Sequence, residues 1–245
     1  GTRSHLKNLY AQDNVILFIN PPSRAGVYQS LGDSLAAIEP PIWARLLSSF
    51  CEKKGIGTAI LDADAEGYDA ETTVQKAVDA EPTLVVVVAH GQQPSASTQV
   101  MPAVIYFCQR FKAEREDVPV LVVGGHPAAL PGRTLEETGA DFVCAGEGPY
   151  TILDLCRYLG KTGAKWRWAS KSRLRGLVYW DHDEACLADP APNIQDLSEM
   201  PGGCWDLLPS LSRYRSHIWH CLQEKSRQPY ASIYSSLGCP YACSF

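Results

Sequence analysis

Two cysteines near the carboxyl end of the sequence, Cys239 and Cys243, have the spacing of an iron–sulfur motif. The sequence ends at Phe245, one residue before the place of the third cysteine in Cys-x-x-x-Cys-x-x-Cys. Three thiolates at this spacing can bind three irons of a [4Fe-4S] cluster and leave the fourth iron open for a substrate. The alternative is that Cys239 and Cys243 are ordinary thiols, because a bare Cys-x-x-x-Cys pair is a weak signal.

The segment before these cysteines alternates apolar and polar residues, which is typical of a β-strand. Residues 231–236 read Ala-Ser-Ile-Tyr-Ser-Ser. Leu237 and Gly238 then allow the backbone to turn into the cysteine loop. We therefore expect a strand that leads directly into the metal site.

The overall composition is that of a globular protein with a sizeable core. The chain has 245 residues, of which 45% are hydrophobic, and a formal net charge of -5, which offers no basic surface to nucleic acid. The longest apolar run, residues 84–89, is far shorter than the roughly 20 residues of a membrane span. Nine scattered cysteines do not form the even framework of a secreted disulfide scaffold, and no charged-then-apolar leader opens the sequence. We expect a cytoplasmic location, no nucleic-acid partner and no membrane span.

Strand-like and helix-like segments alternate between residues 14 and 160. Strands are predicted at residues 15–19, 58–61, 83–89, 118–123 and 141–144. Helices with an apolar stripe are predicted at residues 43–50, 104–111 and 152–159, a polar helix at residues 72–79 and a short helix at residues 134–138. Residues 83–89 are rich in β-branched side chains, as expected of a central parallel strand covered on both faces. The pattern predicts an α/β fold with a doubly wound, five-stranded parallel sheet of Rossmann-like type.

The loops after these strands contain the candidate cofactor-binding residues, because ligands of such sheets bind beyond the carboxyl ends of the strands. The candidates are Asn20, Pro21 and Pro22 after the first strand, His90, Gly91, Gln92 and Gln93 after the third, Gly124, Gly125 and His126 after the fourth, and Gly146, Glu147 and Gly148 after the fifth. The glycines leave room for a broad ligand or a close backbone approach. Neither Gly-x-x-x-x-Gly-Lys-Ser/Thr nor Gly-x-Gly-x-x-Gly follows the first strand, which argues against an ordinary nucleotide site.

The order of these motifs resembles that of the cobalamin-dependent radical S-adenosylmethionine enzymes. The resemblance rests on Pro-Pro after the first strand, Gly-Gly-His-Pro after the fourth, Gly-Glu-Gly after the fifth and the later Gly-Cys-Pro-Tyr-Ala-Cys, and it covers about residues 14–245. It implies cobalamin at the carboxyl edge of the sheet, S-adenosylmethionine, and a [4Fe-4S] cluster on Cys239 and Cys243 with Phe245 beside the third ligand position.

The same resemblance implies an enzymatic activity for the protein that contains this chain. Many members of the family are methyltransferases that use methylcobalamin and a 5′-deoxyadenosyl radical to methylate an unactivated carbon or phosphorus, whereas others catalyse cyclisation or ring contraction. A small-molecule or peptide substrate and an external electron donor such as flavodoxin or ferredoxin are also implied. Catalytic side chains and the substrate itself are not specified by the resemblance.

The loop after the first strand lacks the Asp-x-His-x-x-Gly motif of classical cobalamin methyltransferases, whose histidine binds cobalt from below. We therefore expect the benzimidazole tail to be displaced from cobalt, with no protein histidine in its place. Asp62, Asp64 and Glu66 follow the second strand instead and are interpreted as a solvated, helix-capping loop.

For several candidates a purely structural role is an open alternative. His90 and His126 could hydrogen-bond corrin amides, but His126 could equally brace its turn. Gln92 and Gln93 could pair with the same amides or be satisfied within their loop. Gly146, Glu147 and Gly148 could form only a tight turn into a helix that begins at Pro149.

Three segments are predicted along the chain. They are a cobalamin-binding Rossmann-like domain at residues 1–160, a hairpin and interdomain linker at residues 161–230, and the truncated start of a radical S-adenosylmethionine barrel at residues 231–245. Leu207, Leu208 and Tyr214 are expected to pack on the first domain or on the barrel. Two alternatives remain: a module that only captures cobalamin, and a flavodoxin-like domain for another cofactor.

Overall fold

A mixed sheet with seven strands forms the centre of the protein. The computed structural model describes residues 15–30, 32, 35–91, 96–171, 173–218, 227–238 and 241. The strands are β1 (Ile16–Asn20), β2 (Thr58–Asp62), β3 (Leu84–Ala89), β4 (Val120–Gly124), β5 (Phe142–Cys144), β6 (Leu177–Asp181) and β7 (Glu184–Leu187). Their order is β2-β1-β3-β4-β5-β6-β7, with β1 to β5 parallel and β6 and β7 antiparallel. The five predicted parallel strands and their doubly wound arrangement are therefore confirmed.

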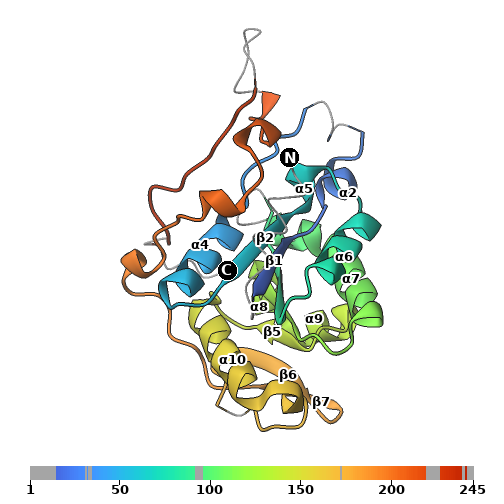
Figure 1. Cartoon of the computed structure of the whole chain (residues 1–245), viewed down its shortest axis with the longest axis vertical. Helices are drawn as coiled ribbons and strands as arrows, with labels where there is room; N and C mark the ends of the chain where they lie inside the picture. Colours follow the sequence, from blue (N-terminus) through green and yellow to red (C-terminus); the bar gives the residue numbers. More distant parts are fainter. Residues whose placement is uncertain are drawn as a thin grey trace.

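Helices cover both faces of the sheet. They are α2 (Arg24–Tyr28), α4 (Ile42–Lys53), α5 (Ala63–Glu66), α6 (Ala70–Asp79), α7 (Ser97–Glu114), α8 (Gly125–Ala129), α9 (Pro131–Thr138) and α10 (Pro149–Thr162), with short 3₁₀ turns η2 (Gly163–Lys165), η3 (Leu197–Glu199), η4 (Trp205–Leu207) and η5 (Leu211–Arg213). Helices α4 and α10 pack on one face, through a core that includes Phe18, Phe50 and Ile152. Helices α6, α7 and α9 pack on the other, around Leu17 and Phe107 (Figure 1). All residues of β3 are buried, as the sequence predicts.

The sheet has seven strands instead of the five predicted, because the predicted hairpin, β6 and β7, adds to it at β5. Phe142 of β5 pairs with Tyr179 of β6 in an antiparallel register, and β6 pairs in turn with β7. This pairing satisfies the backbone groups of the β5 edge, which would otherwise be open to other chains.

The strand predicted at residues 231–236 is not formed. These residues are described and have no strand assignment, and most of them are exposed. A strand needs a neighbour for its backbone N–H and C=O groups, and no described segment pairs with this one. The alternating pattern was therefore insufficient to predict a strand here.

The segment after β7 packs closely on the α4 face of the sheet. Leu207, Leu208 and Tyr214 are buried in the same core as Phe50, which confirms their predicted packing on the α/β domain. An isolated antiparallel bridge joins Arg215 to Ile38. The segment predicted as an interdomain linker therefore also contributes to the core.

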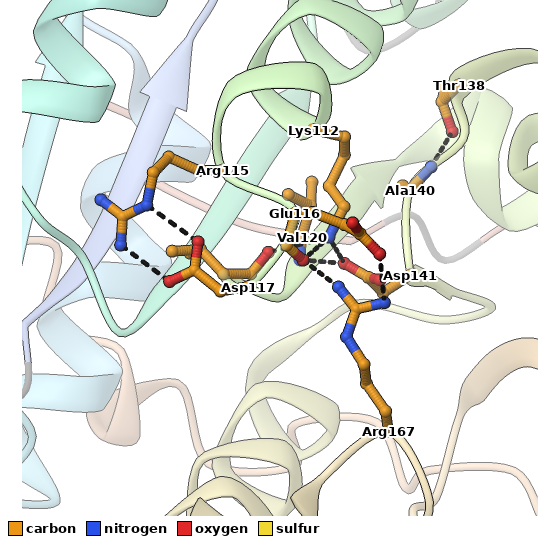
Figure 2. Close-up of polar contacts among 10 residues, drawn as sticks. Lys112, Arg115, Glu116, Asp117, Val120, Thr138, Ala140, Asp141 and Arg167 are labelled. Carbon is orange, nitrogen blue, oxygen red and sulfur yellow. Dashed lines mark hydrogen bonds and ion pairs between the residues drawn. The ribbon is translucent and has the colours of Figure 1, made fainter. Parts of the chain in front are cut away.

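An ionic cluster fixes the connection after α10 to the amino-terminal edge of the sheet (Figure 2). Lys112 Nζ lies 2.8 Å from Asp141 Oδ2, which also accepts a hydrogen bond from Val120 N at 2.9 Å. Arg167 forms an ion pair with Glu116 at 3.4 Å. These contacts give Arg167, in the connection between α10 and β6, a structural role.

Candidate functional site

The candidate site lies between the carboxyl ends of β1 and β3. Along the sheet, β2 lies on one side of β1 and β3 on the other, so the chain reverses its direction of winding at this point. Ligands of open α/β sheets bind at such a switch point. A pocket is present there, with about 790 Å³ of unfilled space that is partly open to solvent.

Three of the predicted cofactor-binding residues come together in this pocket. Asn20 reaches it from the end of β1, and His90 and Gly91 reach it from the end of β3. The pocket does not include Pro21, Pro22, Gly124, Gly125, His126, Gly146, Glu147 or Gly148. Gln92, Gln93, Cys239, Cys243 and Phe245 lie outside the described residues.

His90 presents a neutral imidazole at the pocket wall. Its ring stacks on Trp43 with a centroid separation of 4.7 Å and an interplanar angle of 12°. Burial lowers the pKa of His90 to about 4, because the charged form is poorly solvated there. His90 Nδ1 is buried and has no hydrogen-bond partner in the described structure. A neutral ring with an unpartnered nitrogen can pair with a polar group of a ligand.

Asn20 is held in place by a buried carboxyl group. Asn20 Nδ2 donates to Asp62 Oδ1 at 2.8 Å, and the Tyr214 hydroxyl donates to Asp62 Oδ2 at 2.8 Å. Burial raises the pKa of Asp62 to about 7, although these hydrogen bonds act in the opposite direction. Asp62 also accepts from Ala65 N at 3.3 Å as the N-cap of α5. The predicted capping role is thus confirmed, whereas the predicted solvation of Asp62 is wrong because Tyr214 covers it.

Asp64 connects α2 to the end of β2. Its carboxylate accepts from Ser23 N at 3.4 Å and from Arg24 N at 3.3 Å. Ser23, Arg24 and Asp64 all line the pocket. The acidic loop after the second strand therefore shapes the pocket rather than a separate solvated surface.

The glycines after β3 and β4 allow close packing of the chain on itself. A Cβ on Gly124, whose φ is +151°, would lie 2.3 Å from the carbonyl oxygen of Ala89, and a Cβ on Gly91 would lie 2.5 Å from Ala96 Cβ. The glycines were expected to leave room for a broad ligand or for a close backbone approach. Gly124 shows the close backbone approach. The exposed Gly125 opens the short helix α8 directly after it.

His126 is tied to the start of α7. Its backbone N donates to Ser97 Oγ at 2.9 Å, and its Nδ1 lies 3.1 Å from Thr98 Oγ1. Its Nε2 is buried without a partner among the described residues. His126 therefore braces its turn, while one ring nitrogen stays available.

The loop after β5 forms the turn into α10. Gly148 is the N-cap with a φ of 109°, and Pro149 is the first helical residue. Glu147 Oε2 accepts from Ile194 N at 3.0 Å, so this side chain holds the segment after β7. A Cβ on Gly146 would meet nothing within 4 Å.

Trp43 and Tyr234 are among the pocket residues that the sequence analysis did not identify as site residues. Trp43 was assigned only to the apolar stripe of a helix, and Tyr234 only to a predicted strand, yet both line the pocket. Neither has a local motif that signals a ligand. Only the packing of residues 37–43 and of Tyr234 against the ends of β1 and β3 reveals their place.

The pocket suits a ligand with apolar and polar groups, such as cobalamin. Trp43 supplies an aromatic side chain to its lining, and His90 Nδ1 and Asn20 supply polar groups. In the described part of the chain, no three His, Cys, Asp or Glu side chains are grouped so that they could hold a metal ion, and no helix is long and apolar enough to cross a membrane.

Comparison with known proteins gives matches over this region. The family model described as the B12 binding domain matches residues 28–155. The chain is 25% identical over 236 residues to an anaerobic magnesium-protoporphyrin IX monomethyl ester cyclase of Cereibacter sphaeroides. It is also 25% identical over 231 residues to an uncharacterized methyltransferase of Pyrococcus horikoshii. The chain spans only 34% and 44% of the lengths of these two relatives.

Two solved structures share the fold. One is the radical S-adenosylmethionine methyltransferase TsrM from Kitasatospora setae, with a TM-score of 0.53, 18% identity, and coverage of 74% of this chain and 31% of that one. The other is the cobalamin-dependent S-adenosylmethionine radical enzyme OxsB, with a TM-score of 0.53, 16% identity, and coverage of 75% and 23%. At these identities the likeness establishes the Rossmann-like fold, as predicted.

Proposed function

The chain belongs to the B12-binding domain family, and from this premise we propose that it is the cobalamin-binding portion of a radical S-adenosylmethionine methyltransferase. The proposed reaction methylates an unactivated carbon or phosphorus atom of a small-molecule or peptide substrate. The observation that carries the proposal is the pocket at the β1/β3 switch point, with the unpartnered nitrogen of His90 in its wall. An external electron donor such as flavodoxin or ferredoxin and a cytoplasmic location belong to the same proposal.

The described residues of the pocket bind and orient a cofactor rather than react with it. The stack on Trp43 fixes the plane of the His90 ring, and the low pKa of about 4 keeps that ring uncharged at neutral pH. Asn20 keeps a fixed side-chain orientation because Asp62 accepts its hydrogen bond. When bound, cobalamin supplies a transferable methyl group, and a cluster on Cys239, Cys243 and a third cysteine, together with S-adenosylmethionine, supplies the radical.

A cyclisation reaction is the second candidate. It is favoured by the match to the cyclase of Cereibacter sphaeroides, which has the same 25% identity as the match to the methyltransferase. The binding site for cobalamin would be used in the same way in either reaction. The two candidates differ in whether the product gains a methyl group.

The experiment uses the longer protein that contains this chain, reconstituted with iron, sulfide and cobalamin under anaerobic conditions. Formation of 5′-deoxyadenosine from S-adenosylmethionine is measured for the wild type, Cys239→Ala and Cys243→Ala. We expect both variants to lose this activity, and the control Cys186→Ala, a cysteine of β7, to retain it. Full activity in Cys239→Ala and Cys243→Ala refutes the radical assignment.

A labelled methyl group then separates the two reactions. With S-adenosylmethionine that carries a deuterated methyl group, a methyltransferase transfers the label to the substrate, and mass spectrometry detects the mass increase. Radical formation without transfer of the label, followed by ring closure in the product, assigns the protein to the cyclase branch instead.

A further inference from the structure

A buried arginine without a carboxylate partner lies beside the cofactor pocket. Arg45 of α4 is 4% exposed, and its guanidinium carbon lies 3.4 Å from the centre of the Trp205 ring. Arg45 Nε donates to Gly203 O at 3.3 Å, and Arg45 Nη2 donates to Gly202 O. In the part of the chain that the structure describes, no carboxylate forms an ion pair with Arg45.

This arrangement leaves a positive charge only partly compensated. Removing a cation from water is costly unless an anion or strong hydrogen bonds replace the solvent. A guanidinium has five N–H donors, and the two carbonyl bonds of Arg45 use Nε and Nη2. Among the described residues Nη1 donates to no partner, so it is available to an external acceptor.

Arg45 also lines a hollow with about 640 Å³ of unfilled space. The other walls include the apolar side chains of Ile42 and Leu46 of α4, together with Trp205 of η4, Pro201 and Gly202, and the segment containing Ile233 and Tyr234. Ile233 is 77% exposed and Tyr234 is 45% exposed, so a ligand can reach this side of the hollow.

The hollow is adjacent to the switch-point pocket. Ile42 and Tyr234 line both spaces. A molecule in the hollow would therefore lie next to a cofactor in the pocket, with the Tyr234 side chain between or beside them. This is the position that a substrate needs in order to receive a group from the cofactor.

We propose that this hollow is a carboxylate-binding subsite, in which Arg45 binds the carboxylate of an otherwise apolar substrate and Trp205 and Ile233 contact its apolar body. Guanidinium groups bind carboxylates through charge-assisted, often bidentate hydrogen bonds, and the stack on Trp205 fixes the plane of the fork. That the occupant is the substrate rests on the proposed function. A phosphate group of the cofactor offers the same chemistry, so the test separates these two sources.

The test measures binding of 3-phenylpropionate to this chain by calorimetry, with the neutral 3-phenylpropanamide as the matched ligand. We expect the wild type to bind the acid about tenfold or more tightly than the amide, since one charge-assisted pair contributes at least that factor. Arg45→Met should abolish the preference, and Arg45→Lys should retain part of it. Arg110→Met, at a half-exposed arginine of α7 paired with Glu71, is the control and should leave the preference unchanged.

Equal affinity of the wild type for acid and amide overturns the proposal, and this comparison needs no variant. If Arg45→Met keeps the preference for the acid while its circular dichroism is that of the wild type, the assignment to Arg45 is also overturned.

A second titration uses the chain saturated with hydroxocobalamin. Unchanged acid binding supports a substrate subsite, whereas loss of acid binding assigns Arg45 to the phosphate of the cofactor and overturns the substrate assignment. A chain that binds the acid but retains no cobalamin refutes the proposed function and leaves the carboxylate subsite standing.

Discussion

The buried carboxyl group of Asp62 should make the stability of this protein depend on pH in an unusual direction. Asp62 is 1% exposed and lies between Asn20 and Tyr214. Its pKa is raised from 3.8 to about 7, with burial as the largest cause. Between these two pH values the folded protein retains a proton that the unfolded chain has lost. The free energy of unfolding contributed by Asp62 is therefore fully present below about pH 4 and is lost as the pH rises through about 7.

The size of the effect follows from the pKa difference. A rise from 3.8 to about 7 corresponds to about 4 kcal/mol, because a tenfold change in proton affinity is worth about 1.4 kcal/mol. His90 acts in the opposite sense over an overlapping range, since its pKa is lowered from 6.5 to about 4 and its contribution is lost as the pH falls. The wild-type curve alone would therefore combine two opposing trends.

The substitution Asp62→Asn isolates the carboxyl group, because asparagine cannot ionise and has nearly the same shape. Urea unfolding followed by circular dichroism is measured for both proteins at several pH values between 4.5 and 8. We expect the stability of the wild type relative to Asp62→Asn to fall by most of about 4 kcal/mol across this range. The substitution Asp79→Asn, at an exposed carboxylate of α6, is measured in parallel as the control for removal of one negative charge. A difference that stays constant across this range for Asp62→Asn refutes the reasoning.

Three further substitutions test other parts of the structure. Gly124→Ala should lower the free energy of unfolding, measured in urea, by about 3 kcal/mol or more, because its Cβ would lie 2.3 Å from Ala89 O. The control Gly146→Ala should change the free energy of unfolding by less than about 0.5 kcal/mol. Equal effects of the two substitutions would contradict the packing described. Asp141→Asn should destabilise the protein by about 2–3 kcal/mol, because it leaves Lys112, whose side chain is 13% exposed, without its ion pair. The control Asp117→Asn removes a carboxylate whose side chain is 70% exposed and should cost less than about 1 kcal/mol. A larger loss for Asp117→Asn than for Asp141→Asn would exclude the structural role of the cluster in Figure 2. His90→Phe should keep the stack on Trp43 but weaken cobalamin binding about tenfold in a spectroscopic titration, and an unchanged affinity would remove His90 from the site.

The sequence is sufficient to predict the regular part of the fold. Parallel strands that are buried on both faces need long apolar or β-branched runs, and residues 83–89 show one directly. Amphipathic helices need apolar residues at helical spacing, as Trp43, Leu47 and Phe50 have in α4. Because these patterns are local, the order of elements can be derived before any contact is known.

The rest depends on contacts between distant segments. The antiparallel pairing of β6 with β5 and the burial of Tyr214 against Asp62 join residues that are far apart in the sequence. The missing strand at residues 231–236 has the same origin, because alternation describes a side-chain pattern and not the presence of a neighbour.

The sequence predicts only part of the pocket lining, because the rest of the lining also depends on contacts between distant segments. The rule that ligands bind at the carboxyl ends of parallel strands selected Asn20, His90 and Gly91, and these three residues line one pocket. It does not distinguish them from Gly124 or Gly148, which serve the packing of the chain. Trp43 and Tyr234 become visible only when the walls of the pocket are assembled.

The central claim is that the pocket between β1 and β3 holds cobalamin. The most direct test is to mix this chain with hydroxocobalamin, remove the excess by gel filtration, and record the visible spectrum together with the cobalt content per chain. We expect about one cobalt per chain and the spectrum of cobalamin without its benzimidazole ligand, since the loop after β1 offers no histidine in its place. A chain that retains no cobalt, or a spectrum with a nitrogen ligand below the corrin, would contradict this account.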